Sequence, residues 1–211
     1  MNPAHKNIRI QIREQLDFAT VLYQKGLYKQ SLKLLDKAKN LALENEEKNI
    51  AYEIVELEKV IETQYITRSL SNRADLLSIQ AKTLSQQNVI ASKLSNLSLQ
   101  LYSYLLQNGY VKNNKELEFI KNYFYSKLPK YDFETLGFRE KLWLYKSHLW
   151  FSFLCQDFLH SYKYARKWVD LFKEDKKYAF VFGNEAFGVS EDILPLGDMS
   201  LEIPQFGTKH H

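Results

Sequence analysis

The chain has few of the residues that interrupt or cross-link a fold. It contains 7 glycines, 4 prolines and 1 cysteine in 211 residues. The lone thiol, Cys155, excludes an intramolecular disulfide, and its apolar neighbours predict that it is buried. Four of the glycines and two of the prolines follow residue 182. We therefore expect a helical body over about the first 177 residues and a different structure after it.

Several motifs with known chemistry are also missing. The start of the chain lacks the apolar region of a signal peptide, and no run approaches the ~18 apolar residues of a membrane span. A cytoplasmic protein without membrane contact is expected. No Cys/His spacing predicts a metal site, and phosphate-binding, dinucleotide, serine-hydrolase and zinc-protease motifs are absent. The scattered histidines His5, His148 and His160 are expected to be surface or core residues rather than catalysts.

The overall charge excludes few classes of protein. The net charge is +4, with 45% hydrophobic and 26% charged residues, as in an ordinary globular protein. Such a mild excess permits contact with nucleic acid without indicating it, because a dedicated binder has a clustered basic face.

The first part of the chain predicts paired helices. Apolar residues recur at helical spacing from residue 6 to residue 25, stop at Gly26, and recur to about Glu44. So short a turn requires antiparallel packing. A third helix is predicted over 46–67. Its charges are interpreted as a solvated face: Glu53, Glu56, Glu58, Lys59 and Glu62.

The same pattern continues to about residue 173. Further helices are predicted at 73–108, 115–127, 138–156 and 157–173, with a loop over 128–138. A break near Gln87-Asn88 would divide the first of these into two helices. Asn108-Gly109 is a typical helix stop, and Asn113-Asn114 can cap the next helix.

Two of the turns resemble the tetratricopeptide helix-turn-helix. The first is Gly26-Leu-Tyr28-Lys-Gln-Ser31, followed by Ala38, and the second is Asp157-Phe158-Leu-His-Ser161. In the second, Trp168 takes the place of the small Ala38, and no regular period links the two. The resemblance implies a mainly α fold, a degenerate antiparallel helical-hairpin array over residues 1–174, whose task is to bind a protein partner.

Aromatic residues are concentrated in the later helices. Residues 119–172 hold 17 of the 30 aromatics, including all three tryptophans. At helical spacing they predict core packing, with a groove for a partner peptide or a nucleobase as the alternative. Bases and rings alternate from Tyr162 to Trp168, as in single-strand RNA binders, but helical geometry directs these side chains to different faces.

The last part of the chain predicts a short α/β fragment. The apolar run Tyr178 to Phe182 is predicted to be a buried strand, and Met199 to Ile203 a second strand. Gly183 and Gly188 flank Asn184-Glu185 and allow the backbone to approach a ligand closely.

Two motifs in this fragment resemble those of SpoU-like RNA ribose 2′-O-methyltransferases of the SPOUT class. They are Phe182-Gly-Asn-Glu-Ala-Phe-Gly-Val-Ser190 and Ile203-Pro-Gln-Phe-Gly-Thr-Lys-His210. The resemblance implies an S-adenosylmethionine pocket in a trefoil-knotted, usually dimeric, fold. The residues implied to line it are Gly183, Asn184, Glu185, Gly188, Ile203 and Gly207. Glu185 is also the candidate catalytic residue, and a solvated loop acid is its alternative.

The resemblance covers residues 177–210 only. The family's first motif, with its Asn and Arg, has no counterpart earlier in the chain, and the Ser-Leu-Asn that continues its third motif does not follow His210. Two parts are therefore expected, 1–174 and 175–211, as from a gene fusion, a truncation or an assembly error. The predicted function is a protein-interaction module carrying an incomplete S-adenosylmethionine-binding segment. The alternative is an RNA 2′-O-methyltransferase, with RNA as a further partner.

Overall fold

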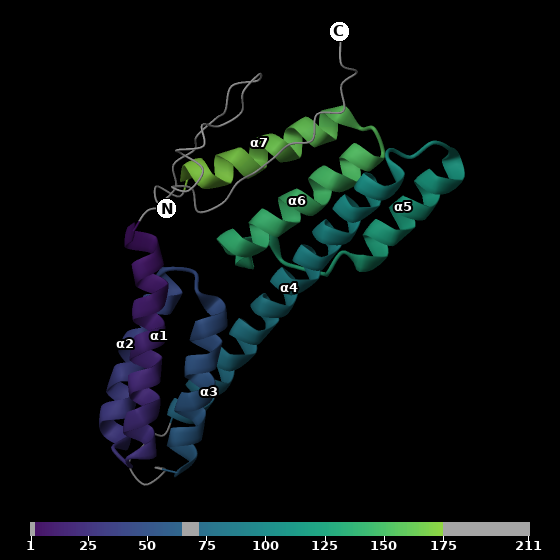
Figure 1. The fold of residues 1–211 in the computed structure, drawn as a ribbon. Coiled ribbons are helices and arrows are strands. Elements are labelled where there is room, and N and C mark those ends of the chain that lie inside the picture. The colour runs from purple at the N-terminus through teal and green to yellow at the C-terminus, as the bar shows by residue number, and fades with distance from the viewer. Residues whose placement is uncertain (1–2, 65–71, 175–211) are drawn as a thin grey trace.

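The computed structural model describes residues 3–64 and 72–174, and all the regular structure in those ranges is helical (Figure 1). The helices are α1 (Pro3–Gln24), α2 (Tyr28–Glu44), α3 (Lys48–Gln64), α4 (Arg73–Asn108), α5 (Asn114–Lys127), the 3₁₀ turn η2 (Phe133–Thr135), α6 (Phe138–Leu154) and α7 (Phe158–Glu174). The prediction of a mainly α protein is thus confirmed for the described residues. The predicted strands 178–182 and 199–203 lie outside them.

The first three helices and the start of α4 form one half of the molecule. α1 and α2 are antiparallel, and α3 packs against α2 and α4 (Figure 1). Their shared core is aliphatic, with Ile12, Leu35, Ile54 and Leu77 among its buried members. The apolar periodicity of the sequence places these residues on facing stripes, and burying the stripes holds the helices together.

Three helix-to-helix turns share one backbone pattern. At Gly26, Glu46 and Gln156 the φ angle is positive, at 72°, 58° and 57°. Each residue donates its N–H to the carbonyl three residues back, and the next residue donates to the carbonyl five back. This is the Schellman motif, in which a left-handed residue closes the helix. The α1–α2, α2–α3 and α6–α7 connections are therefore equivalent turns, although only the first contains glycine.

Adding a side chain at the glycine turns tests this geometry. We expect Gly26→Ala to lower the free energy of unfolding by about 1 kcal/mol, because the left-handed backbone penalises a Cβ while no atom lies within 4 Å of it. Gly109, with φ 73° and ψ −155°, lies in a region open only to glycine, so Gly109→Ala should cost about 2–3 kcal/mol. Urea unfolding of both variants provides the measurement. Equal losses of unfolding free energy would contradict the assignment of Gly109 to a backbone region open only to glycine.

The helix α4 joins the two halves of the molecule. Its 36 residues form one continuous helix, about 54 Å long at 1.5 Å per residue. Leu77 and Leu84 belong to the first core, and Leu94 and Leu101 to the cores of the second half. The predicted break near Gln87-Asn88 is therefore wrong. Both residues are compatible with helix, and the Asn88 amide donates to the Lys48 carbonyl at 3.4 Å.

In the second half, α5 and α6 pack against the end of α4, and α7 packs against α6 (Figure 1). Trp168 and Phe172 of α7 meet Leu142 and Leu149 of α6 in one cluster, and Phe124 of α5 lies in another. The helix end at Asn108-Gly109 and the cap at Asn113 are confirmed, whereas α6 ends at Leu154 rather than at residue 156. Gly109 follows α4, and the Asn113 side chain accepts from the Glu116 N–H at 3.0 Å.

The third helix is shorter than predicted at its start. Helix α3 begins at Lys48 rather than residue 46, because Glu46 and Glu47 form the turn from α2. Without a glycine, that turn gives no local signal in the sequence. The predicted end of this helix at residue 67 lies outside the described residues.

Candidate functional site

The residues predicted to bind S-adenosylmethionine all lie outside the described residues. They are Gly183, Asn184, Glu185, Gly188, Ile203 and Gly207. The functional features of the described residues lie in the helical part.

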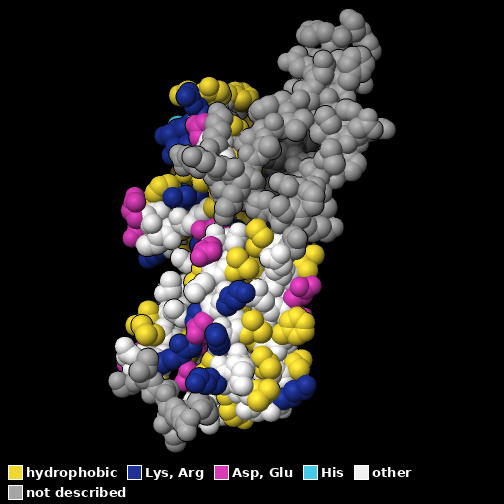
Figure 2. All heavy atoms as spheres, turned by 90° about the vertical axis from the view of Figure 1, so that its left-hand side faces the viewer, with side chains coloured by type: hydrophobic (Ala, Val, Ile, Leu, Met, Phe, Trp, Pro, Cys, Tyr) yellow, Lys and Arg dark blue, Asp and Glu magenta, His cyan; other side chains and the backbone are white. Residues whose placement is uncertain are grey.

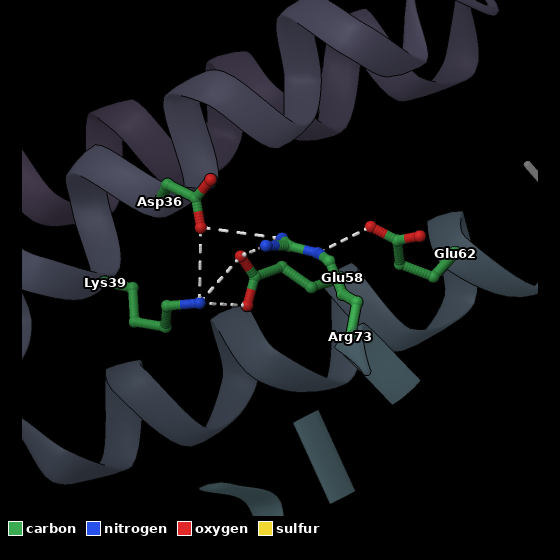
Figure 3. A network of polar contacts seen from close by, with 5 residues as sticks. All are labelled: Asp36, Lys39, Glu58, Glu62 and Arg73. Atoms are coloured by element: carbon green, nitrogen blue, oxygen red, sulfur yellow. Dashed lines mark hydrogen bonds and ion pairs between the residues drawn. The ribbon is translucent and has the colours of Figure 1, made fainter. Parts of the chain in front are cut away.

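A buried polar network joins α2, α3 and α4 (Figure 3). The Lys39 ammonium of α2 donates to both oxygens of Glu58 on α3, at 2.6 and 2.9 Å. Arg73 of α4 contacts Glu58 at 3.3 Å and Glu62 at 2.6 Å. Asp36 lies 3.4 Å from Lys39 and 3.5 Å from Arg73. Two cations thus connect three carboxylates from neighbouring helices.

Glu58 overturns the prediction that the charges of this helix form a solvated face. Its side chain is 0% exposed. Burial raises the pKa of Glu58 to about 7, although the hydrogen bonds from Lys39 oppose the rise. Burial also acts to raise the pKa of Asp36, but its hydrogen bond with Glu58 and the nearby Lys39 and Arg73 together lower it. Because these charged groups are engaged with one another, the network is a structural clamp.

A second polar cluster links the two halves. The Lys48 ammonium, at the start of α3, lies 2.9 Å from Glu140 of α6 and 3.3 Å from Glu46. Glu140, only 1% exposed, also accepts from the Gly137 N–H at 2.9 Å. A Cβ at Gly137 would collide with the Lys48 ammonium. A larger residue at this position would push the ends of the Lys48, Glu46 and Glu140 side chains aside. The cluster fixes the start of α6 against α3.

The outer face of α7 carries exposed apolar and basic side chains. Leu159 and Tyr162 are 79% and 66% exposed, and Lys163 and Arg166 lie exposed between them and the end of the helix. Residues 159, 163, 166 and 170 fall on one side of a 3.6-residue helix, opposite the buried Trp168. They line a surface hollow together with Tyr162. We call this stripe, Leu159, Tyr162, Lys163, Arg166 and Asp170, the α7 face.

The first helix has a matching stripe of opposite charge. Ile10, Phe18 and Val21 are exposed, with Phe18 at 64%, and Glu14 and Asp17 are exposed beside them. These five residues, the α1 face, lie opposite the stripe that packs into the core. Figure 2, seen from the side of α1 and α2, shows hydrophobic side chains gathered on the lower part of the molecule, interleaved with charged ones. Sequence reasoning missed this face because it followed only the core stripe.

The aromatic residues divide between core and surface. Phe124, Tyr145, Trp150, Trp168 and Phe172 are buried, which confirms the core interpretation for them. Phe119, Tyr125, Phe133, Phe158 and Tyr162 are exposed. The expectation that the rings and bases of 162–168 point to different faces is confirmed. Trp168 faces the core while Lys163 faces outward, so the segment presents no continuous stacking platform.

His148 has a packing role, whereas His160 lies at the surface. His148 stacks on Tyr164, with ring centroids 4.3 Å apart, and meets the edge of Phe124 at 5.0 Å. Burial lowers the pKa of His148 to about 4, and Lys167 and His160 add to the effect. His160 is exposed and contacts Asp157 at 2.7 Å. Cys155 is half-buried rather than fully buried, and burial raises the pKa of its thiol.

The described residues therefore define an all-α protein with open faces on its first and last described helices. Comparison with protein-family profiles, curated proteins and solved structures found no match. Over residues 3–64 and 72–174, no helix is both long and apolar enough to cross a membrane. The same residues contain no group of three or more side chains placed to hold a metal ion.

Proposed function

We propose that residues 1–174 form a protein-interaction module built as a degenerate tetratricopeptide-like array. Antiparallel hairpins with equivalent Schellman turns support this architecture. Small residues at the first hairpin support it too, since Ala19, Ser31 and Ala38 are all buried. The Ser31 hydroxyl donates to the Ala19 carbonyl at 2.7 Å, which brings α1 and α2 close together.

The α7 face is the single observation on which the binding function rests. Leu159 and Tyr162 place apolar surface in water, and covering it would be favourable by about 25 cal/mol per Å². Lys163 and Arg166 beside them can pair with carboxylates of a partner. Apolar anchors with a charged rim are typical of protein interfaces. The α7 face therefore favours a protein partner over RNA, which would require aligned rings.

Photo-cross-linking tests this function. A benzophenone amino acid in place of Tyr162 should form adducts with another polypeptide in cells that natively express the protein. The matched control is the same replacement at Leu106 on α4, which is similarly exposed at 58%. Adducts at 162 and not at 106 support a docking face on α7. No polypeptide adduct at either position would contradict the binding function.

For residues 175–211 the proposed function rests on the sequence resemblance alone. The segment is proposed to be part of an S-adenosylmethionine-binding loop set, which lacks the first motif that a catalyst requires. The alternative is an S-adenosylmethionine-dependent RNA 2′-O-methyltransferase with Glu185 in the active site. Calorimetric titration of the full chain with S-adenosylmethionine, combined with an assay of methyl transfer to RNA, separates the two. Heat that saturates, together with methyl transfer to RNA, supports the enzyme, and no heat at millimolar cofactor excludes it.

A further inference from the structure

We infer that the α7 face of one copy of this chain docks on the α1 face of a second copy, in a head-to-tail contact. The inference rests on the proposed function and names the partner of that surface. Its basis is that the two faces, on the first and last described helices, are complementary in charge and each presents exposed apolar residues. In such arrays each helical hairpin buries its open face against the next one.

The two faces have the same spacing along their helices. Ile10, Glu14, Asp17 and Val21 are separated by four, three and four residues, as are Leu159, Lys163, Arg166 and Asp170. Each stripe therefore runs nearly parallel to its helix axis over about 16 Å, at 1.5 Å per residue. Two such stripes can meet along their whole length without bending either helix.

Antiparallel docking matches the side chains in order. It sets Val21 against Leu159 at one end, so that two apolar groups are buried together. Next along the stripe it sets Asp17 opposite Lys163, and Glu14 opposite Arg166. Phe18 and Tyr162, both largely exposed, then flank the contact as aromatic anchors.

One end of the docked pair requires adjustment. The same register places Ile10 near Asp170, whose carboxylate lies 3.7 Å from the Arg166 guanidinium. Arg166 would then interact with both Asp170 and Glu14, as one guanidinium can bind two carboxylates. The α2–α3 pair provides the packing precedent, since these antiparallel helices from successive hairpins already pack together within the chain.

A symmetric dimer is disfavoured by the same charges. Pairing two α1 faces would bring Glu14 and Asp17 against their own copies, and pairing two α7 faces would oppose Lys163 and Arg166. Like charges in contact oppose association. The complementary contact is heterologous, so copies add in one direction and form rings or open chains. One helix face on each side is a small interface, so we expect a Kd of about 10 μM to 1 mM.

Sedimentation of the full-length protein at rising concentration tests the inference. Wild type should shift to larger species, and 0.5 M salt should weaken the shift. Two reversed variants are made, Glu14→Lys/Asp17→Lys and Lys163→Glu/Arg166→Glu. Each alone should stay monomeric, because both of its faces then carry the same sign. Their equimolar mixture should associate again. The reversed, positive α1 face of the first variant then complements the reversed, negative α7 face of the second.

The matched control is Lys82→Glu/Lys93→Glu, which reverses two exposed charges on α4 away from both faces. It should associate like wild type, and circular dichroism should show the same helix content in all variants. A wild type that is monomeric at millimolar concentration overturns the inference, as does a mixture that does not associate. If cross-linking at 162 then captures a different polypeptide, the binding function stands and only the second copy as partner is rejected.

Discussion

Replacing Lys39 with Met is expected to lower the free energy of unfolding by about 3–5 kcal/mol. The Lys39 ammonium makes the two shortest contacts to Glu58, which is 0% exposed. Removing it leaves the buried Glu58 carboxylate with the 3.3 Å contact to Arg73 as its remaining contact with a cation. An unpaired buried charge is costly because water no longer solvates it.

Urea unfolding at pH 8 measures this loss, and two further variants interpret it. In Lys39→Met/Glu58→Met the carboxylate is gone, so most of the lost stability should return. Lys59→Met is the matched control, because Lys59 makes a half-exposed pair with Glu56 at 2.9 Å and should cost about 0.5 kcal/mol. A Lys39→Met loss as small as that of Lys59→Met would contradict the clamp.

Stability should depend on pH through two buried groups that act in opposite directions. The pKa of Glu58 is raised from 4.5 to about 7. Its contribution to the free energy of unfolding is therefore full below pH 4.5 and is lost as the pH rises through 7. The pKa of His148 is lowered from 6.5 to about 4, so its contribution is full above pH 6.5 and is lost as the pH falls toward 4. In wild type these two opposite changes in the free energy of unfolding largely cancel between about pH 4 and pH 7.

Single variants should separate the pH dependence due to Glu58 from that due to His148. Relative to wild type, Glu58→Gln should lose about 3 kcal/mol of stability as the pH falls from 7 to 4.5, because the proton uptake by Glu58 is missing. His148→Phe keeps the ring stack and should instead gain about 3 kcal/mol relative to wild type over the same range. Unfolding free energies at several pH values provide the measurement. Parallel profiles for all three proteins would contradict both assignments.

The helical body was predictable because it depends on local pattern. Apolar spacing, Gly26, Asn108-Gly109 and Asn113 each act within a few residues of where they stand in the sequence. The start of α3 was predicted two residues too early because Glu46 adopts a left-handed backbone, at φ 58°, without the glycine that signals such a turn. A polar pair such as Gln87-Asn88 does not end a helix that packs along its whole length.

The buried network could not be predicted from local pattern. Glu58 has the sequence context of an exposed charge, and its partners Lys39 and Arg73 lie 19 and 15 residues away. Only the packing of α2 and α4 against α3 brings them together. The α1 and α7 faces were hidden for a related reason. An exposed apolar stripe is recognised only after the opposite side of the helix is known to be buried.

Cross-linking from position 162 in native cells tests the binding function most directly. We predict polypeptide adducts at 162 that disappear in Lys163→Glu/Arg166→Glu, whereas the control position 106 gives none. Adducts that are unchanged by the charge reversal, or the absence of any polypeptide adduct at 162, would contradict it.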